Sequence, residues 1–161
     1  MVLPNKEARI LVVDDDKELA DTLVEYLLKI GYQAAPAYGG REGLSMFYQG
    51  DFQLVITDLK MPEMDGIELL DALRKLDSRV MVMVITGYGT IESAVEAIKK
   101  GAYDFIPKPF KMEELEIIVK RALERHTLLR QLGMFRGLTL ALIISVPFWL
   151  ILGIVLALVW K

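Results

Sequence analysis

Residues 52–66 read FQLVITDLKMPEMDG, and this stretch contains the pattern from which the rest of the chain can be interpreted. Its first part, Phe52–Thr57, is a short and nearly continuous apolar run, which predicts a strand covered on both faces. The run ends at Asp58, and Pro62 and Gly66 are expected to shape the loop that follows. Three further runs of the same kind occur at Ile10–Val13, Val80–Thr86 and Tyr103–Ile106.

Helical patterns alternate with these strands. Apolar residues recur at helical spacing in Lys17–Ile30, Gly40–Tyr48, Ile67–Leu76 and Thr90–Lys100, and again from Lys111 onward. A weaker strand, Tyr32–Ala37, fits between the first two helices, and its Pro36 favours an edge position. Strict alternation predicts the α/β class, with a flavodoxin-like, doubly wound, five-stranded parallel sheet of order 2-1-3-4-5.

Helix boundaries have their own signals in the sequence. Asp16 and Thr90 are expected to cap the N-termini of the first and fourth helices, because their side chains accept hydrogen bonds from unpaired backbone N–H groups. Gly31 and Gly101 are expected to end the helices that precede them.

Polar side chains stand where the predicted strands end: Asp14, Asp15 and Asp16, then Asp58, Thr86 and Lys108. Because the carboxyl ends of parallel strands meet at one edge of a sheet, we expect these side chains to share a crevice. A cluster of oxygen donors without His or Cys favours Mg²⁺. Lysine and threonine suit a phosphate group, and a carboxylate held beside them can attack phosphorus. Taken singly, each residue could equally be a helix cap or a solvated loop residue.

Composition excludes several other classes of protein. The chain has no cysteine, which excludes disulfides, thiolate metal sites and cysteine nucleophiles. The net charge of the chain is −3, and residues 1–119 are its acidic part. Nucleic-acid binding requires a basic face, so we expect no nucleic-acid partner. The N-terminus MVLPNKEAR lacks an apolar signal core, so export of this part is not expected.

Four motifs together resemble one known family. The stretches VVDDDKE (12–18), VITDLKMPEMDG (55–66), VITGYGTIESAVEAIKKGA (84–102) and YDFIPKPF (103–110) are similar to the receiver domains of bacterial two-component response regulators, particularly the NtrC-like branch. The resemblance covers about residues 8–125 and implies the CheY-like form of the fold.

The resemblance also implies a role for each site residue. Asp58 would be the phosphoacceptor in an Mg²⁺-dependent reaction. The metal ligands would be Asp14, Asp15, Asp58 and the backbone carbonyl of Lys60. Thr86 and Lys108 would contact the phosphoryl group, Thr86 and Phe105 would form the switch pair, and Lys108–Pro109 would be a cis bond. The implied partner is a sensor histidine kinase or a phosphotransfer protein, and the implied output surface is the face formed by helix four, strand five and helix five.

The C-terminal part differs from the body. Residues 137–160 contain no charged side chain, and their number matches the roughly 20 residues of helix that span a bilayer. They predict a transmembrane helix, with a hydrophobic oligomerisation helix in water as the alternative. The domains expected are therefore a receiver at 1–125, a basic helical linker at 126–136 and the span at 137–160.

Basic residues flank this apolar segment on the receiver side. Lys120, Arg121, Arg125, Arg130 and Arg136 oppose Glu124 alone. The positive-inside rule then places a single-pass protein in the bacterial inner membrane with its receiver in the cytoplasm and its basic stretch against anionic lipid. The small residues Gly137, Ala141 and Ser145 are spaced by four, which favours a homodimer within the bilayer.

Three functional hypotheses follow. The first is a membrane-tethered response regulator receiver, not an enzyme beyond its own aspartyl phosphorylation and dephosphorylation. The second is a phosphate sink or membrane recruitment module without its own output. The third is a phosphohydrolase, which the sequence disfavours because Lys60 stands where such enzymes place a second Asp. No ATPase or helix-turn-helix pattern follows the receiver, so a transcriptional output is not expected of these residues.

Overall fold

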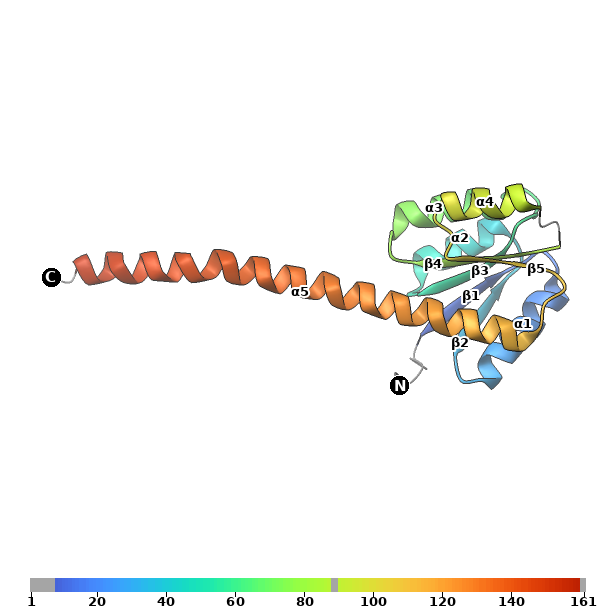
Figure 1. Ribbon diagram of the computed structural model, residues 1–161, viewed down its shortest axis with the longest axis horizontal. Helices are drawn as coiled ribbons and strands as arrows, with labels where there is room; N and C mark the ends of the chain where they lie inside the picture. The colour runs from blue at the N-terminus through green and yellow to red at the C-terminus, as the bar shows by residue number, and fades with distance from the viewer. Residues whose placement is uncertain (1–7, 88–89, 160–161) are drawn as a thin grey trace. The chain divides into compact units, whose positions relative to one another are not determined.

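The computed structural model describes the backbone of residues 8–87 and 90–159, with side chains described through residue 130 and at a few positions beyond it. Strands and helices alternate along the chain (Figure 1). The strands are β1 (Arg9–Val13), β2 (Gln33–Ala37), β3 (Leu54–Asp58), β4 (Met81–Thr86) and β5 (Asp104–Pro107). The helices are α1 (Lys17–Lys29), α2 (Gly40–Gln49), α3 (Gly66–Leu76), α4 (Ile91–Lys99) and α5 (Met112–Val159).

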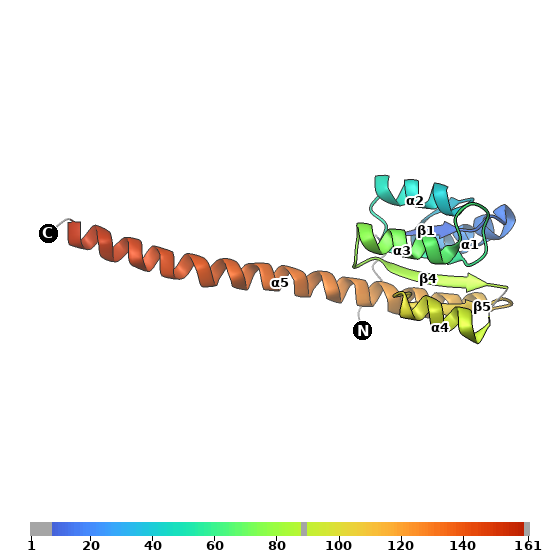
Figure 2. The same ribbon diagram turned by 90° about the horizontal axis from the view of Figure 1, so that it is seen from above.

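The five strands form one parallel sheet in the order β2-β1-β3-β4-β5, which confirms the order predicted from the sequence. Helices cover both faces: α1 and α5 lie on one side, and α2, α3 and α4 lie on the other (Figures 1 and 2). Strand β2 is an edge strand, and its Pro36 pairs with Val12, as the proline predicts.

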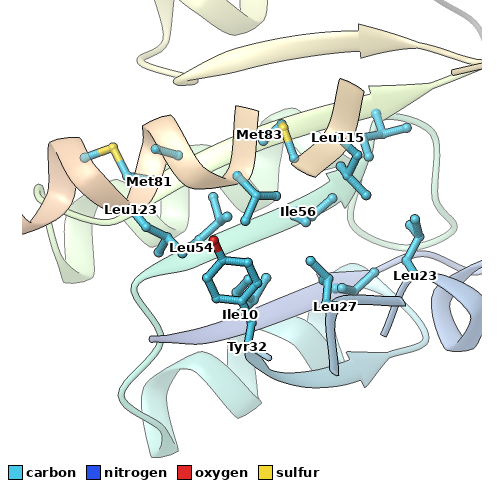
Figure 3. Close-up of a cluster of buried hydrophobic side chains, with 14 of the residues drawn as sticks. Ile10, Leu23, Leu27, Tyr32, Leu54, Ile56, Met81, Met83, Leu115 and Leu123 are labelled. Atoms are coloured by element: carbon cyan, nitrogen blue, oxygen red, sulfur yellow. The ribbon is translucent and has the colours of Figure 1, made fainter. Parts of the chain in front are cut away.

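Two hydrophobic clusters hold these layers together. On the α1 and α5 side, Leu27 and Leu115 pack with Ile10, Leu54 and Ile56, and all five are at most 1% exposed (Figure 3). The cluster on the other face joins residues of β1, β3 and β4 to α2 and α3, and includes Ala97 from α4. Burying a large apolar side chain contributes roughly 1.5–3 kcal/mol, so these clusters supply the main stabilisation of the sheet.

The helix boundaries follow the predicted signals. The Asp16 side chain accepts a hydrogen bond from Leu19 N, and Thr90 forms a capping box with Ser93 at the start of α4. Gly31 and Gly101 adopt φ values of 98° and 97°, in the left-handed region that glycine enters without strain. Both caps and both glycine stops are therefore confirmed.

Some strand boundaries were predicted too early. Strand β3 begins at Leu54 rather than Phe52, and β4 begins at Met81 rather than Val80. Phe52 and Val80 are buried all the same, and Arg9 lies 4.8 Å from the centroid of the Phe52 ring. The apolar run in the sequence is therefore longer than its strand, because residues outside the hydrogen-bonded ladder are buried too.

The chain divides into two units, residues 1–126 and 127–161. In the second unit α5 continues to Val159 with Pro147 inside it. Within the part of the chain that the structure describes, no helix has a stretch both long and apolar enough to cross a bilayer. The transmembrane span was predicted at residues 137–160, and most side chains of these residues lie outside the part of the chain that the structure describes.

Candidate functional site

The strand register brings the predicted site residues to one edge of the sheet. Val13 pairs with Thr57, and Thr86 pairs with Pro107, so Asp14, Asp58 and Lys108 stand together just beyond the paired positions or at their end. The carboxylates differ in exposure. Asp14 and Asp58 are buried, at 4% and 7% exposed, whereas Asp15 is exposed. The edge therefore combines the desolvated Asp14 and Asp58 with solvated acids such as Asp15.

Lys108 joins the two buried acids. Its Nζ lies 2.8 Å from Oδ1 of Asp58 and 3.0 Å from Oδ2 of Asp14. Its backbone N–H donates to the carbonyl of Thr86 at 2.8 Å, and the Lys108–Pro109 peptide bond is cis, as the family resemblance implies. The turn after β5 is thus attached to the end of β4 and directs the ammonium group between two carboxylates.

Burial and charge shift the protonation of this group of side chains. Burial raises the pKa of Asp14 above its ordinary value, and hydrogen bonds from the Asp16 N–H and from Lys108 offset only part of that effect. Burial alone would lower the pKa of Lys108, but its hydrogen bonds to Asp58 and Asp14 outweigh burial and raise it. The lysine is therefore held in its charged form, ready to neutralise an anion.

Backbone groups fix the orientation of Asp58. The N–H of Lys60 donates to Oδ2 of Asp58 at 2.6 Å, and the hydroxyl of Thr57 donates to the Asp58 carbonyl at 2.9 Å. Similarly, the N–H of Asp16 donates to Oδ1 of Asp14 at 2.9 Å. These contacts of Asp16 and Thr57 were not anticipated, although an acidic residue two positions before a helix cap is a local signal for the first of them.

The acids open into a cleft of about 590 Å³, lined by Asp14, Asp15, Asp16, Asp58, Lys60, Gly87 and Lys108. Thr86 is fully buried at the end of β4, and the residue that follows it, Gly87, lines the cleft. Phe105 is half-buried on β5 and packs against the cluster on the α2 and α3 side. The structure thus brings Asp14, Asp15, Asp58, Lys60 and Lys108 into one cleft, with Thr86 and Phe105 on the adjoining strands.

The donor set around the cleft suits a hard cation. All available side-chain ligands are carboxylate oxygens, the type that Mg²⁺ prefers, and Mg²⁺ usually combines a few carboxylates with waters and phosphate oxygens. Within the described residues, no three His, Cys, Asp or Glu side chains are grouped closely enough to hold a metal by themselves. A backbone carbonyl and a phosphoryl oxygen would therefore have to complete the coordination.

Comparisons with known proteins agree with the geometry. A family model described as the response regulator receiver domain matches residues 10–120. The regulatory protein AtoC of Escherichia coli K12 is 37% identical over 124 residues, which cover 77% of this chain and 27% of that protein. The nitrogen assimilation regulatory protein NtrX of Azorhizobium caulinodans is 39% identical over 132 residues, covering 81% and 29% respectively.

Solved structures give the same result. A response regulator receiver domain protein from Clostridium thermocellum aligns with a TM-score of 0.73 at 32% identity, over 76% of this chain and 98% of that one. NtrX from Brucella abortus, solved in complex with ADP, aligns with a TM-score of 0.75 at 37% identity, over 79% and 29%. The chain thus spans less than a third of the length of the curated relatives it matches.

Proposed function

Because this chain belongs to the response regulator receiver domain family, we propose that it accepts a phosphoryl group on Asp58 from a sensor histidine kinase or a phosphotransfer protein. The observation that carries the proposal is the buried Asp58 carboxylate, which lies 2.8 Å from the Lys108 ammonium in an open cleft. A nucleophile here is reachable by a donor, and the cation beside it can stabilise the charge that develops on the transferred group.

The transfer step is a displacement at phosphorus. A carboxylate oxygen of Asp58 forms a bond to phosphorus, the P–N bond of the phosphohistidine donor breaks, and the imidazole leaves as its nitrogen regains a proton from solvent. The Lys108 ammonium group, a compact charge on a flexible stem, contacts the phosphoryl oxygens, and Thr86 supplies a hydroxyl donor. Loss of the phosphoryl group to water returns the carboxylate.

Receiver domains bind Mg²⁺ generally, and the residues here fit that ion. We assign its ligands to Asp14, Asp15, Asp58 and the backbone carbonyl of Lys60. When bound, Mg²⁺ neutralises the acidic cleft and the charge on the transferred phosphoryl group. Asp14 and Asp58 already face Lys108 in the structure, so this chain's own residues position the acceptor before a donor arrives.

We propose that phosphorylation alters the surface formed by α4, β5 and α5, and that partner proteins bind there. Thr86 and Phe105 lie on the adjacent strands β4 and β5, next to this face. The outer side of α4 carries an apolar stripe at helical spacing, Ile91, Val95 and Ile98, with exposures of 81%, 45% and 48%. Only Ala97 of α4 is buried. A weakly buried helix with an exposed apolar stripe suits a surface that changes its partner on phosphorylation.

Two further proposals concern the whole chain. Lys60 stands where phosphohydrolases with an Asp nucleophile place a second Asp, which supports a protein that catalyses only its own phosphorylation and dephosphorylation. A phosphatase assay on external phosphomonoesters would test this. The uncharged stretch 137–160 supports a single-pass anchor in the bacterial inner membrane, with the receiver on the cytoplasmic side and homodimerisation through its small residues.

The test of the main proposal is labelling by a phosphorylated kinase or by acetyl phosphate. We expect label that requires Mg²⁺ and is released by hydroxylamine, as an acyl phosphate is, and its loss in Asp58→Asn. Asp16→Asn is the matched control, because Asp16 lines the same cleft but caps α1. Label that survives Asp58→Asn would show that another residue is the acceptor.

A further inference from the structure

The loop between β3 and α3, residues 59–65, is fixed at both ends. The N–H of Gly66 donates to the carbonyl of Leu59 at 2.9 Å, which closes the loop. The Asp65 side chain accepts from the N–H groups of Ile67 and Glu68, and the Glu68 side chain accepts from Asp65 N, which completes a capping box. This loop directly follows Asp58 and carries the Lys60 carbonyl, so its position sets the position of one proposed metal ligand.

The middle of the loop rests against the first turn of α2. A Cβ atom added to Gly40 would lie well within 3.0 Å of the carbonyl oxygen of Met64, and 2.8 Å from the Met64 Cγ. Side-chain atoms can rotate away from such a contact, but a backbone carbonyl moves only with its loop. An alanine at position 40 would therefore displace the loop 59–65.

An ion pair strengthens the same contact. Nε of Arg41 lies 3.2 Å from Oε2 of Glu63, although both side chains are 72% exposed. Glu63 has a φ of 63°, a backbone conformation that residues other than glycine rarely adopt. The surrounding structure must therefore hold this position. The Met64 N–H donates to the Pro62 carbonyl at 2.7 Å across Glu63, and α2 contacts the loop at Glu63 and at Met64.

We propose that Gly40 is a positioning residue for the phosphoryl site: the close contact of α2 with the Met64 carbonyl fixes the loop 59–65 and thereby places the Lys60 carbonyl relative to Asp14 and Asp58. This inference rests on the proposed Mg²⁺-dependent function and assigns to α2 a part in it. The absence of a side chain at position 40 is what permits the contact.

The chain contains a matched control beside Gly40. A Cβ atom on Gly39 would meet nothing within 4 Å, and its φ of 162° is extended backbone that any residue adopts. Gly39→Ala and Gly40→Ala thus make the same chemical change at adjacent positions, one in open space and one against the loop.

The experiment is a calorimetric titration of the full chain with Mg²⁺ alone, accompanied by thermal unfolding without Mg²⁺ to check folding. We expect Gly40→Ala to bind Mg²⁺ roughly tenfold more weakly, as for other residues that orient a metal ligand from outside the coordination shell. Gly39→Ala should bind like the wild type. Arg41→Gln, which removes an exposed ion pair, should weaken binding by about two- to threefold.

A residue with only a structural role would lower the unfolding temperature and leave the Mg²⁺ affinity of the folded protein unchanged. Wild-type affinity in folded Gly40→Ala would therefore overturn the inference. If Gly40→Ala does not unfold cooperatively, Arg41→Gln decides, and unchanged affinity there overturns it. Failure of the proposed function is distinguishable, because then Asp14→Asn would not reduce Mg²⁺ binding either.

Discussion

Lys108 Nζ lies 2.8 Å from Oδ1 of Asp58, in a cleft where Asp58 itself is 7% exposed. The lysine is also 3.0 Å from Asp14, so one ammonium group forms ion pairs with two buried carboxylates. Without a counter-charge, two desolvated acids this close would disfavour ionisation of each other. The lysine therefore supplies a positive charge between the two acids, and occupies a position that a divalent cation must share.

Replacement of this lysine should separate metal binding from phosphoryl transfer. We predict that Lys108→Met binds Mg²⁺ several-fold more tightly, because a competing cation is removed. It should accept label from acetyl phosphate at least about tenfold more slowly, because a stabilising charge is lost at the same time. Calorimetry and initial labelling rates measure the two effects. Lys111→Met, which removes an exposed cation nearby, is the control. Weaker Mg²⁺ binding by Lys108→Met would contradict the competition.

Acid stability should depend on Asp77, the C-cap residue of α3. Burial would raise the pKa of Asp77, but hydrogen bonds from Arg79 and the charges of Arg79 and His126 outweigh burial and hold it below 3.8. Because the folded-state pKa is depressed, the ionised group stabilises the fold above pH 3.8, and this stabilisation is lost as the pH falls through the lower folded value.

We therefore predict that Asp77→Asn lowers the free energy of unfolding by about 1 kcal/mol at pH 7 and that the difference disappears in acid. Urea unfolding at a series of pH values measures it. Asp51→Asn, which makes the same change at an exposed position, is the control variant. A deficit in Asp77→Asn that persists unchanged well below pH 3.8 would show that the carboxylate charge is not its cause.

Adjacent leucines on α1 should differ sharply in their contribution to stability. Leu27 is completely buried, whereas Leu28 is 50% exposed. We predict that Leu27→Ala reduces the free energy of unfolding by about 2–5 kcal/mol, because it leaves a cavity against β1 and α5. Leu28→Ala should change it by about 0.5 kcal/mol or less. Denaturant titrations compare them, and similar losses in both variants would contradict the packing.

Membrane attachment can be tested by truncation after Arg136. We predict that the full chain remains in the membrane fraction after high-salt and alkaline washes. Such washes release proteins held by electrostatic contacts, whereas the uncharged residues 137–160 would be held by burial in the hydrocarbon core. The truncated protein should be soluble and should still accept label at Asp58. Recovery of the full chain in the soluble fraction without detergent would exclude a membrane span.

The sequence was sufficient to predict the sheet order and the meeting of Asp14, Asp58 and Lys108, because both follow from the alternation of strands and helices and from the shared edge of parallel strands. It did not predict that one lysine bridges both acids, which depends on the path of the turn after β5. Nor did it distinguish the buried Asp14 from the exposed Asp15, because adjacent residues in a turn point in different directions.

Long-range contacts were also beyond sequence reasoning. Gly40 was predicted only as the start of a helix, and its contact with Met64 becomes visible when α2 and the loop before α3 lie side by side. Arg74 reads as an ordinary cation near a helix C-terminus, yet its guanidinium donates to the carbonyls of Ser78 and Gly101, which joins α3 to the turn before β5. Such contacts leave no periodic signal.

The most direct test of the account is to locate the phosphoryl group. The full chain is labelled with acetyl phosphate and Mg²⁺ and then reduced with borohydride, which converts an aspartyl phosphate into homoserine. We predict homoserine at position 58 in the peptide that contains VITDLKMPEMDG, and none in a sample prepared without Mg²⁺. Reduction at Asp14 or Asp15, or unmodified Asp58 in fully labelled protein, would contradict the central claim.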